Sequence, residues 1–158
     1  MKKTFLLLMI FFAAFSVKAQ QKDPTTMNDV YEFVKKCGHY FIATTEGNQP
    51  RVRPFGTVVI YENRLYIQTS KQKRIAQELK KNPKIEICAL NLTENTWVRI
   101  EATAVADERK VAKQFVLDKY PELKSMYSAD DDKTLILYLK DATAYFSSFS
   151  GDTKIVKF

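Results

Sequence analysis

The sequence predicts an α+β domain in which three or four helices flank an antiparallel sheet. Segments rich in β-branched and aromatic residues follow one another through short turns, without the long crossovers that parallel strands need. Six or so strands joined in this way usually close into a small barrel. Aromatic residues make up 13% of the chain, with only four glycines and five prolines, a composition that excludes a disordered protein.

The first helix is predicted by apolar residues at the spacing of one helix face. These residues are Val30, Phe33, Val34 and Cys37. Thr26 can cap the start of this helix and Gly38 can end it. A short amphipathic helix therefore precedes the first strand.

The strands are predicted by β-rich runs that end at turn signals such as Glu46-Gly47-Asn48 and Gly151-Asp152. The expected strands are 40–45, 51–61, 65–69, 85–90, 97–106, 134–139, 143–149 and 154–158.

Two further helices interrupt these strands. One is expected to open at Ser70 and to run to about Lys81, because Asn82-Pro83 then stops it. The other is expected after Asp107 as its cap and before Pro121. Residues 123–127 are expected to add a short helical turn.

The N-terminus has the order of a secretory signal peptide. Two lysines precede an apolar run of eleven residues from Phe5 to Phe15, and small residues follow up to Ala19. Eleven helical residues rise about 16 Å, roughly half of the hydrocarbon thickness, so this run is too short to span a membrane. We therefore expect residues 1–19 to be removed and residues 20–158 to form one exported domain, periplasmic or extracellular, without stable membrane insertion.

The charge of the expected mature chain is modest. Removing residues 1–19 takes away three lysines and no acids, so the formal net charge falls from +7 to +4. A charge of this size does not by itself indicate nucleic-acid binding.

The potential metal and disulfide residues give weak signals. Cys37 and Cys88 each lie in an apolar run, which favours two buried free thiols, although an oxidising compartment would permit a disulfide. His39 has no second ligand near it in the sequence, and residues 130–132 lack the glycine and distal glutamate of a calcium loop. No metal site is predicted.

The expected start of the second helix carries unusual charges. A helix N-terminus favours acidic residues, yet Lys71, Lys73 and Arg74 follow directly after Thr69 and Ser70. A bound phosphate would reverse the sign of each unfavourable charge and would accept hydrogen bonds from the hydroxyl groups. The alternative is a solvated basic face.

A second basic feature lies on the strand 51–61. Arg51 and Arg53 are two residues apart, so both side chains point to one face. Pro54-Phe55-Gly56 then interrupts the strand, since proline lacks a donor and glycine lacks a side chain. A bulge or the approach of a flat ligand would explain this interruption. Trp97 could stack on such a ring, although a single tryptophan more often belongs to a core.

Several segments together resemble a known family. The segments 36–44, 49–56, 65–66, 69–74, 82–83, 97–99, 126–128 and 149–152 resemble the pyridoxamine 5′-phosphate oxidase-like FMN-binding split barrels in order and spacing. The likeness is greatest to the short nitroimidazole-resistance (Nim) branch. The resemblance implies a six-stranded antiparallel split barrel and a homodimer with FMN at the interface.

The resemblance also implies which residues would hold the cofactor. The phosphate would contact Arg51 or Arg53 together with Thr69, Ser70, Lys71, Lys73 and Arg74, and the ring would lie against backbone of residues 54–56, with Trp97 nearby. The candidate cofactor-binding residues are Arg51, Arg53, Pro54, Phe55, Gly56, Gln68, Thr69, Ser70, Lys71, Lys73, Arg74 and Trp97.

The implied function is that of an FMN-dependent oxidoreductase with an unknown small-molecule substrate. No general acid or base stands out, and the C-terminal substrate-binding segment of true pyridoxamine phosphate oxidases is not recognisable, so that reaction is not transferred. One alternative is a non-catalytic flavin- or haem-binding protein, with His39 as the imidazole for a haem iron. Another is an interaction domain with a basic patch.

Overall fold

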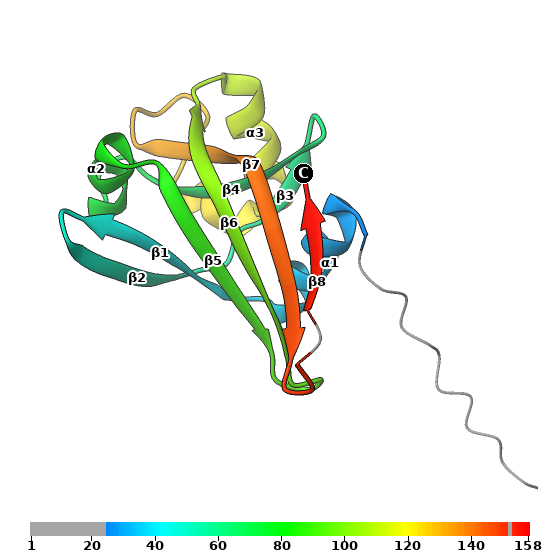
Figure 1. The fold of residues 1–158 in the computed structure, drawn as a ribbon. Coiled ribbons are helices and arrows are strands. Elements are labelled where there is room, and N and C mark those ends of the chain that lie inside the picture. The colour runs from blue at the N-terminus through cyan, green and yellow to red at the C-terminus, as the bar shows by residue number, and fades with distance from the viewer. Residues whose placement is uncertain (1–24, 152) are drawn as a thin grey trace, which may run out of the picture.

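The computed structural model describes residues 25–151 and 153–158, so the expected signal peptide lies outside the described residues. The helices are α1 (Met27–Cys37), α2 (Arg74–Lys81), α3 (Lys110–Lys119) and the 3₁₀ helix η1 (Pro121–Ser125). The strands are β1 (Tyr40–Glu46), β2 (Gln49–Phe55), β3 (Val59–Tyr61), β4 (Arg64–Ser70), β5 (Lys84–Asn91), β6 (Thr96–Asp107), β7 (Thr134–Ser148) and β8 (Thr153–Lys157). Figure 1 shows their arrangement.

All eight strands belong to one antiparallel sheet of order β2-β1-β5-β6-β7-β4-β3, with β8 added to β7. This is the expected α+β split barrel, although its sheet has eight strands where the family resemblance implied six. The run 51–61 is divided between β2 and β3, while 134–149 forms one long strand rather than two. β2 and β3 are the two edge strands of this order. In the described part of the chain they do not pair with each other, so the barrel is open between them.

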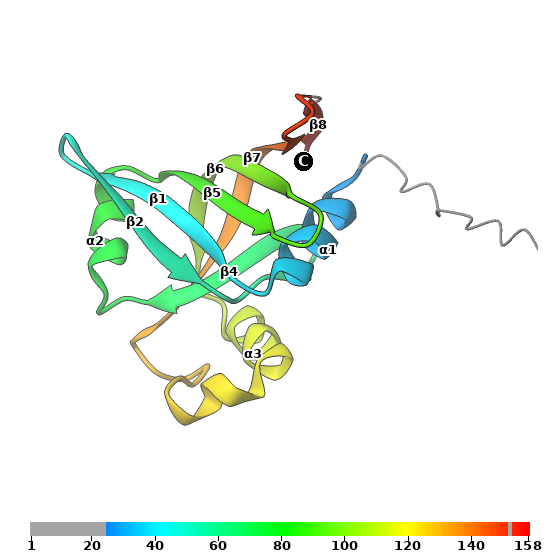
Figure 2. The same ribbon diagram turned by 90° about the horizontal axis from the view of Figure 1, so that it is seen from below.

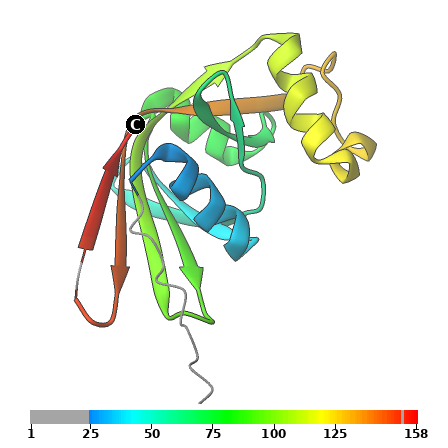
Figure 3. The ribbon, with the colours of Figure 1, turned by 90° about the vertical axis from the view of Figure 1, so that its right-hand side faces the viewer.

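The helices cover different parts of the sheet. Figures 2 and 3 show α1 within the curve of the sheet and α3 well away from α1. The helix α1 contacts β3, β5, β6 and β8, whereas α3 contacts β3 and β7. Two apolar clusters result, a main core inside the barrel and a smaller one under α3.

The structure confirms the predicted first helix and its signals. Thr26 and Asp29 form a capping box, in which each side chain accepts a bond from the other residue's backbone amide. Gly38 ends the helix with φ of 72°, a conformation that favours glycine. Val30 and Val34 are buried in the main core, as the periodicity predicts.

The predicted start of the second helix is wrong. Thr69 and Ser70 are the last residues of β4, because they pair with Leu135 and Thr134 of β7. Residues 71–73 form a turn, and α2 begins at Arg74 after the N-cap Lys73. Lys71 and Lys73 therefore lie on the strand-to-helix turn, and only Arg74 of the three predicted cations lies in the first helical turn.

Two smaller expectations also change. Asp107 is the last residue of β6 and accepts the backbone amide of Arg109, which is itself the N-cap of α3. Both cysteines are free, as expected, but Cys88 is exposed while Cys37 packs against the main core. Burial alternates along β5, so Cys88 points away from the core that Cys37 contacts.

The helices of the described residues are all too short or too polar to cross a bilayer.

Candidate flavin site

A cavity of about 430 Å³ lies where β2 is interrupted, beside the end of α1. Its walls come from residues 38–39, 54–57, 68–69, Lys73 and several residues between 120 and 127. These segments are far apart in the sequence and include the C-terminal ends of α1 and β2. The cavity is therefore built where loops and strand ends converge, as small-molecule sites commonly are.

Half of the sequence-predicted cofactor residues line this cavity. They are Pro54, Phe55, Gly56, Gln68, Thr69 and Lys73. The others lie on the polar network of the β1–β2 hairpin, on a different cavity, or at the far end of the sheet, as described below.

One wall contains a buried hydroxyl group without a partner. Thr69 is only 2% exposed, and its Oγ1 makes no hydrogen bond with any described residue. A buried polar group left unsatisfied costs about 1–3 kcal/mol. Because Thr69 also lines the cavity, a polar ligand there would supply the missing partner.

Side chains hold the interrupted segment 56–58 in place. The Tyr40 hydroxyl donates to the carbonyl of Thr57 at 2.5 Å. The Tyr120 hydroxyl donates to the Val58 carbonyl at 3.0 Å and accepts the Val58 amide at 2.9 Å. These bonds replace the ladder bonds that the strand loses, so the wall is fixed although it is not part of the sheet. Burial raises the pKa of Tyr40, which keeps its hydroxyl protonated as a donor.

Thr57 and Gln68 join this wall to the neighbouring strand. The Thr57 hydroxyl accepts the Gln68 amide at 3.0 Å and donates to the Gln68 carbonyl at 3.3 Å. The Gln68 side-chain amide donates to the carbonyl of Thr69 at 2.8 Å. The two walls of the cavity are therefore hydrogen-bonded to each other.

His39 lies at the cavity beside Gly56. A Cβ atom added to Gly56 would lie 3.6 Å from Cδ2 and 3.7 Å from Nε2 of His39, which is ordinary contact. His39 is exposed and is the only imidazole of the chain.

Lys73 brings a positive charge to the cavity. It is the N-cap of α2, and that helix has no acidic residue in its first turn and no side-chain cap. Among the described residues no carboxylate pairs with Lys73. An unpaired cation at a helix N-terminus favours a bound anion.

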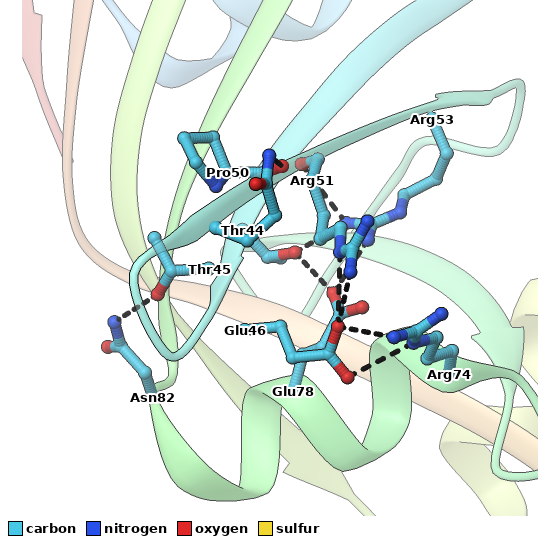
Figure 4. A network of polar contacts seen from close by, with 10 residues as sticks. Thr44, Thr45, Glu46, Pro50, Arg51, Arg53, Arg74, Glu78 and Asn82 are labelled. Carbon is cyan, nitrogen blue, oxygen red and sulfur yellow. Dashed lines mark hydrogen bonds and ion pairs between the residues drawn. The ribbon is translucent and has the colours of Figure 1, made fainter.

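Three predicted arginines lie in a polar network between the β1–β2 hairpin and α2 (Figure 4). Arg53 pairs with the buried Glu78 at 2.6 Å and donates to the Thr44 hydroxyl at 2.5 Å. Thr44 in turn donates to Glu78. Because Glu78 is only 2% exposed, this pair supports the structure and leaves Arg53 little freedom to reach a ligand.

The other two arginines share one carboxylate. Glu46 accepts Arg51 at 2.7 Å and Arg74 at 2.5 Å. Hydrogen bonds from Arg74 and then from Arg51 lower the pKa of Glu46. In contrast to Glu78, this carboxylate lies at the surface, so its ion pairs are weak.

Ser70 and Lys71 do not line the first cavity. The Ser70 hydroxyl accepts the amide of Gln72 at 3.2 Å. Lys71 pairs with Glu108 at 2.6 Å and lines a second cavity of about 250 Å³, whose floor includes Leu79 and other apolar residues of α2, β6 and β7.

Trp97 is remote from the cavity lining within one chain. It lies near the start of β6, and its ring meets Phe149 edge-on with centroids 5.3 Å apart. Phe149 is among the most exposed apolar residues of the described chain. Trp97 does not line the cavity.

Sequence reasoning missed Thr57 and Tyr120, which fix the wall of the cavity. Neither residue belongs to a local motif. Tyr120 reads as an apolar residue of the third helix, and its contact with Val58 joins positions 62 residues apart. No local signal could have revealed either role.

The described residues contain no group of three or more side chains suited to hold a metal ion.

A family model and several solved structures are similar to this chain. The family model described as pyridoxamine 5′-phosphate oxidase matches residues 27–140. A NimC/NimA family protein from Clostridium acetobutylicum is 38% identical, with 84% of this chain and 92% of that chain covered and a TM-score of 0.80. The comparison with curated protein sequences gave no match.

Two more distant structures share the fold. General Stress Protein 26 from Bacillus anthracis is 15% identical, with 82% of this chain and 98% of that one covered and a TM-score of 0.62. A pyridoxamine 5′-phosphate oxidase-related, FMN-binding protein from Nostoc punctiforme is 13% identical, with coverages of 77% and 87% and a TM-score of 0.53. Together with the match over most of the described residues, these findings confirm the expected resemblance, and the chain belongs to the pyridoxamine 5′-phosphate oxidase-like split-barrel family, in its Nim-like branch.

Proposed function

We propose that this protein binds FMN in the cavity beside β2 and acts as a flavin-dependent oxidoreductase on a small molecule. The observation that carries the proposal is the cavity itself, which combines an unpartnered buried hydroxyl on Thr69 with the unpaired cation of Lys73. A flavin nucleotide needs both a polar flat wall for its ring and positive charge for its phosphate.

The residues present suit such a ligand. The segment 56–58 offers backbone outside the sheet, held firmly by Tyr40 and Tyr120, and a planar ring can lie against it. Lys73 lines the cavity, and Arg51 and Arg74 meet at Glu46 beside it, so these three cations would neutralise a phosphate. When bound, the flavin would supply the redox chemistry, while the chain would orient it and restrict water at one face. The imidazole of His39 lines the same cavity.

The relatives support a flavin as the ligand. The Nostoc punctiforme structure is described as FMN-binding, and a Mesorhizobium loti protein with a TM-score of 0.51 is described as FAD-binding. Both are distant relatives, and the NimC/NimA protein at 38% identity is described by family only. The choice of FMN therefore depends on the phosphate-binding cations of this chain.

We also propose a homodimer that completes the site. A row across the outer face of β1, β5, β7 and β8 places Phe41, Cys88, Tyr145 and Ile155 in register around Arg99. Phe41 is 55% and Ile155 is 58% exposed, and exposed apolar side chains that gather on one face favour an interface. A second copy on this face would bring Trp97 of one protomer toward the flavin of the other.

Export is the third part of the proposal. It rests on the signal-peptide pattern of residues 1–19 and implies that the cofactor is acquired outside the cytoplasm. Intact-mass analysis of the protein from its native host is expected to give a chain that begins at Gln20. A full-length soluble cytoplasmic protein would contradict export without affecting the flavin site.

The absorbance spectrum of the purified mature protein, before and after incubation with FMN, tests the ligand. Flavin bands that remain after gel filtration are the expected result, and photoreduction followed by a screen of electron acceptors then tests turnover. A Soret band after incubation with haem, with no flavin retained, would favour the haem-binding alternative, for which His39 lies at the cavity. Retention of neither chromophore would contradict the proposal.

A further inference from the structure

The polar network beside the cavity consists of two parts with different freedom to move (Figure 4). Its five charged residues are Arg51, Arg53, Arg74, Glu46 and Glu78. The side chain of Glu78 is 2% exposed, whereas that of Glu46 is 34% exposed. The two carboxylates therefore differ in what their displacement would cost.

The buried part is fixed. Glu78 accepts Arg53 at 2.6 Å and also accepts the hydroxyl of Thr44, which itself accepts Arg53. Separating Arg53 from Glu78 would leave an uncompensated charge in the protein interior. Arg53 is thus committed to Glu78 and is not free to bind a ligand.

The exposed part has the geometry of an occupied anion site. Oε2 of Glu46 accepts Arg51 through Nε at 3.1 Å and Nη2 at 2.7 Å. Arg74 donates through Nε to Oε1 at 3.1 Å and through Nη2 to Oε2 at 2.5 Å. One carboxylate therefore takes four N–H bonds from two guanidinium groups, one on β2 and one at the start of α2. Phosphate oxygens accept bonds from paired arginines in the same manner.

The position of Glu46 also allows it to leave. It is the last residue of β1, directly before the turn at Gly47 and Asn48. Ion pairs at the surface contribute little stability and are screened by solvent, so this side chain can turn outward without loss of the fold.

We propose that Glu46 is an internal counter-anion that occupies Arg51 and Arg74 until the phosphate of FMN displaces it. This inference rests on the proposed function, and it makes Glu46 a determinant of how strongly the site prefers a phosphorylated flavin. Riboflavin has no phosphate, so its binding leaves Glu46 on the two arginines. Removal of the carboxylate is then expected to strengthen FMN binding and to leave riboflavin binding unchanged.

The test is titration of FMN and of riboflavin into the mature apo protein and its Glu46→Gln variant, followed by flavin fluorescence. Glu46→Gln keeps the size of the side chain and removes its charge. We expect FMN to bind about tenfold more tightly, since one competing anion with two exposed ion pairs is lost. Riboflavin affinity is expected to stay the same.

Glu62→Gln is the matched control. Glu62 also lies at a turn between two strands and pairs with an arginine, Arg109, through two bonds of 2.8 and 3.2 Å. It does not line the cavity. Its loss removes the same kind of ion pair and is expected to change neither flavin affinity. If Glu46→Gln does not fold, Glu46→Thr repeats the titration, because threonine is suited to a strand end.

Unchanged or weaker FMN binding by Glu46→Gln, while wild-type protein binds FMN, would overturn the inference and leave the proposed function standing. An equal gain for FMN and riboflavin would overturn it as well, because the effect would then not concern the phosphate. Absence of flavin binding by wild type and variants alike would overturn both.

Discussion

Tyr120→Phe is expected to destabilise the protein strongly although it removes a single oxygen atom. The Tyr120 hydroxyl donates to the Val58 carbonyl, accepts the Val58 amide and accepts Lys35 Nζ at 3.1 Å, so all its bonding capacity is used. Val58 is 2% exposed, and both its backbone groups would lose this partner. At about 1–3 kcal/mol for each buried unsatisfied group, and with partial rescue by water from the cavity, the loss is about 2–4 kcal/mol.

Calorimetry and urea unfolding of the mature apo protein measure this effect. For a domain of this size, a loss of 2–4 kcal/mol lowers Tm by roughly 6–16 °C. Tyr127→Phe is the control, because Tyr127 lines the same cavity and its hydroxyl makes no hydrogen bond to the described residues. Its expected change is below about 0.5 kcal/mol. If Tyr120→Phe were as stable as this control, the segment 56–58 would not depend on the hydroxyl.

Three further predictions concern the cavity, the loop before β7 and the outer sheet face. Lys73→Glu is expected to weaken FMN binding more than tenfold in a fluorescence titration and to leave riboflavin affinity unchanged. The Tm of the apo protein is expected to stay the same or rise slightly, since Glu suits a helix N-terminus. A lower apo Tm with unchanged FMN affinity would make Lys73 a structural residue. Asp131→Ala is expected to cost about 1–2 kcal/mol at pH 7, as the loss of a capping carboxylate does. Burial raises the pKa of Asp131, but bonds from Thr134, Ser128 and Lys133 outweigh it and lower that pKa from 3.8 to about 2. The stabilisation by the ionised carboxylate is therefore present above pH 3.8 and lost as the pH falls toward 2. Urea unfolding at both ends of this range should show that the difference in free energy of unfolding between wild type and Asp131→Ala shrinks at low pH. A difference that stays constant would refute this role of the Asp131 carboxylate. Phe41→Glu is expected to turn the proposed dimer into a monomer by light scattering, and an unchanged dimer would place the interface elsewhere.

Local patterns predicted most of the elements because their signals lie within a few residues. The periodicity of α1, its capping residue Thr26 and the terminal Gly38 all act within one helix, and the structure has them as predicted. The interruption at Pro54-Phe55-Gly56 was also visible, since missing donors and side chains are local properties. The predicted hairpin at Gly47 has the same origin.

The errors arise where distant partners decide the structure. Ser70 is a good helix cap in isolation, but its pairing with Thr134 of β7 extends β4 through it, and α2 starts four residues later. The joining of 134–149 into one strand similarly depends on the long partner β6, with a register shift between Glu101 and Thr103.

The predictions for the site divide in the same way: features set by nearby residues were predicted, and pairings between distant residues were not. The cations expected at the start of the second helix indicated an anion site, and the structure brings one of them, Lys73, to the cavity beside Thr69. The sequence could not show which cations already have partners, because Arg53 and Glu78 are 25 residues apart and meet only in the fold. Arg74 and Glu46 are 28 residues apart and meet in the same way.

Comparison of FMN and riboflavin binding by the wild-type mature protein tests the central claim most directly. Isothermal titration of both ligands into apo protein is expected to show one FMN per chain, bound at least tenfold more tightly than riboflavin, because one charge-assisted phosphate contact contributes about 1.5–3 kcal/mol. The difference should shrink as salt is raised, since the cations at Lys73 and Arg74 are exposed. Equal affinities for the two flavins, or no binding of either, would contradict a phosphate-anchored flavin site.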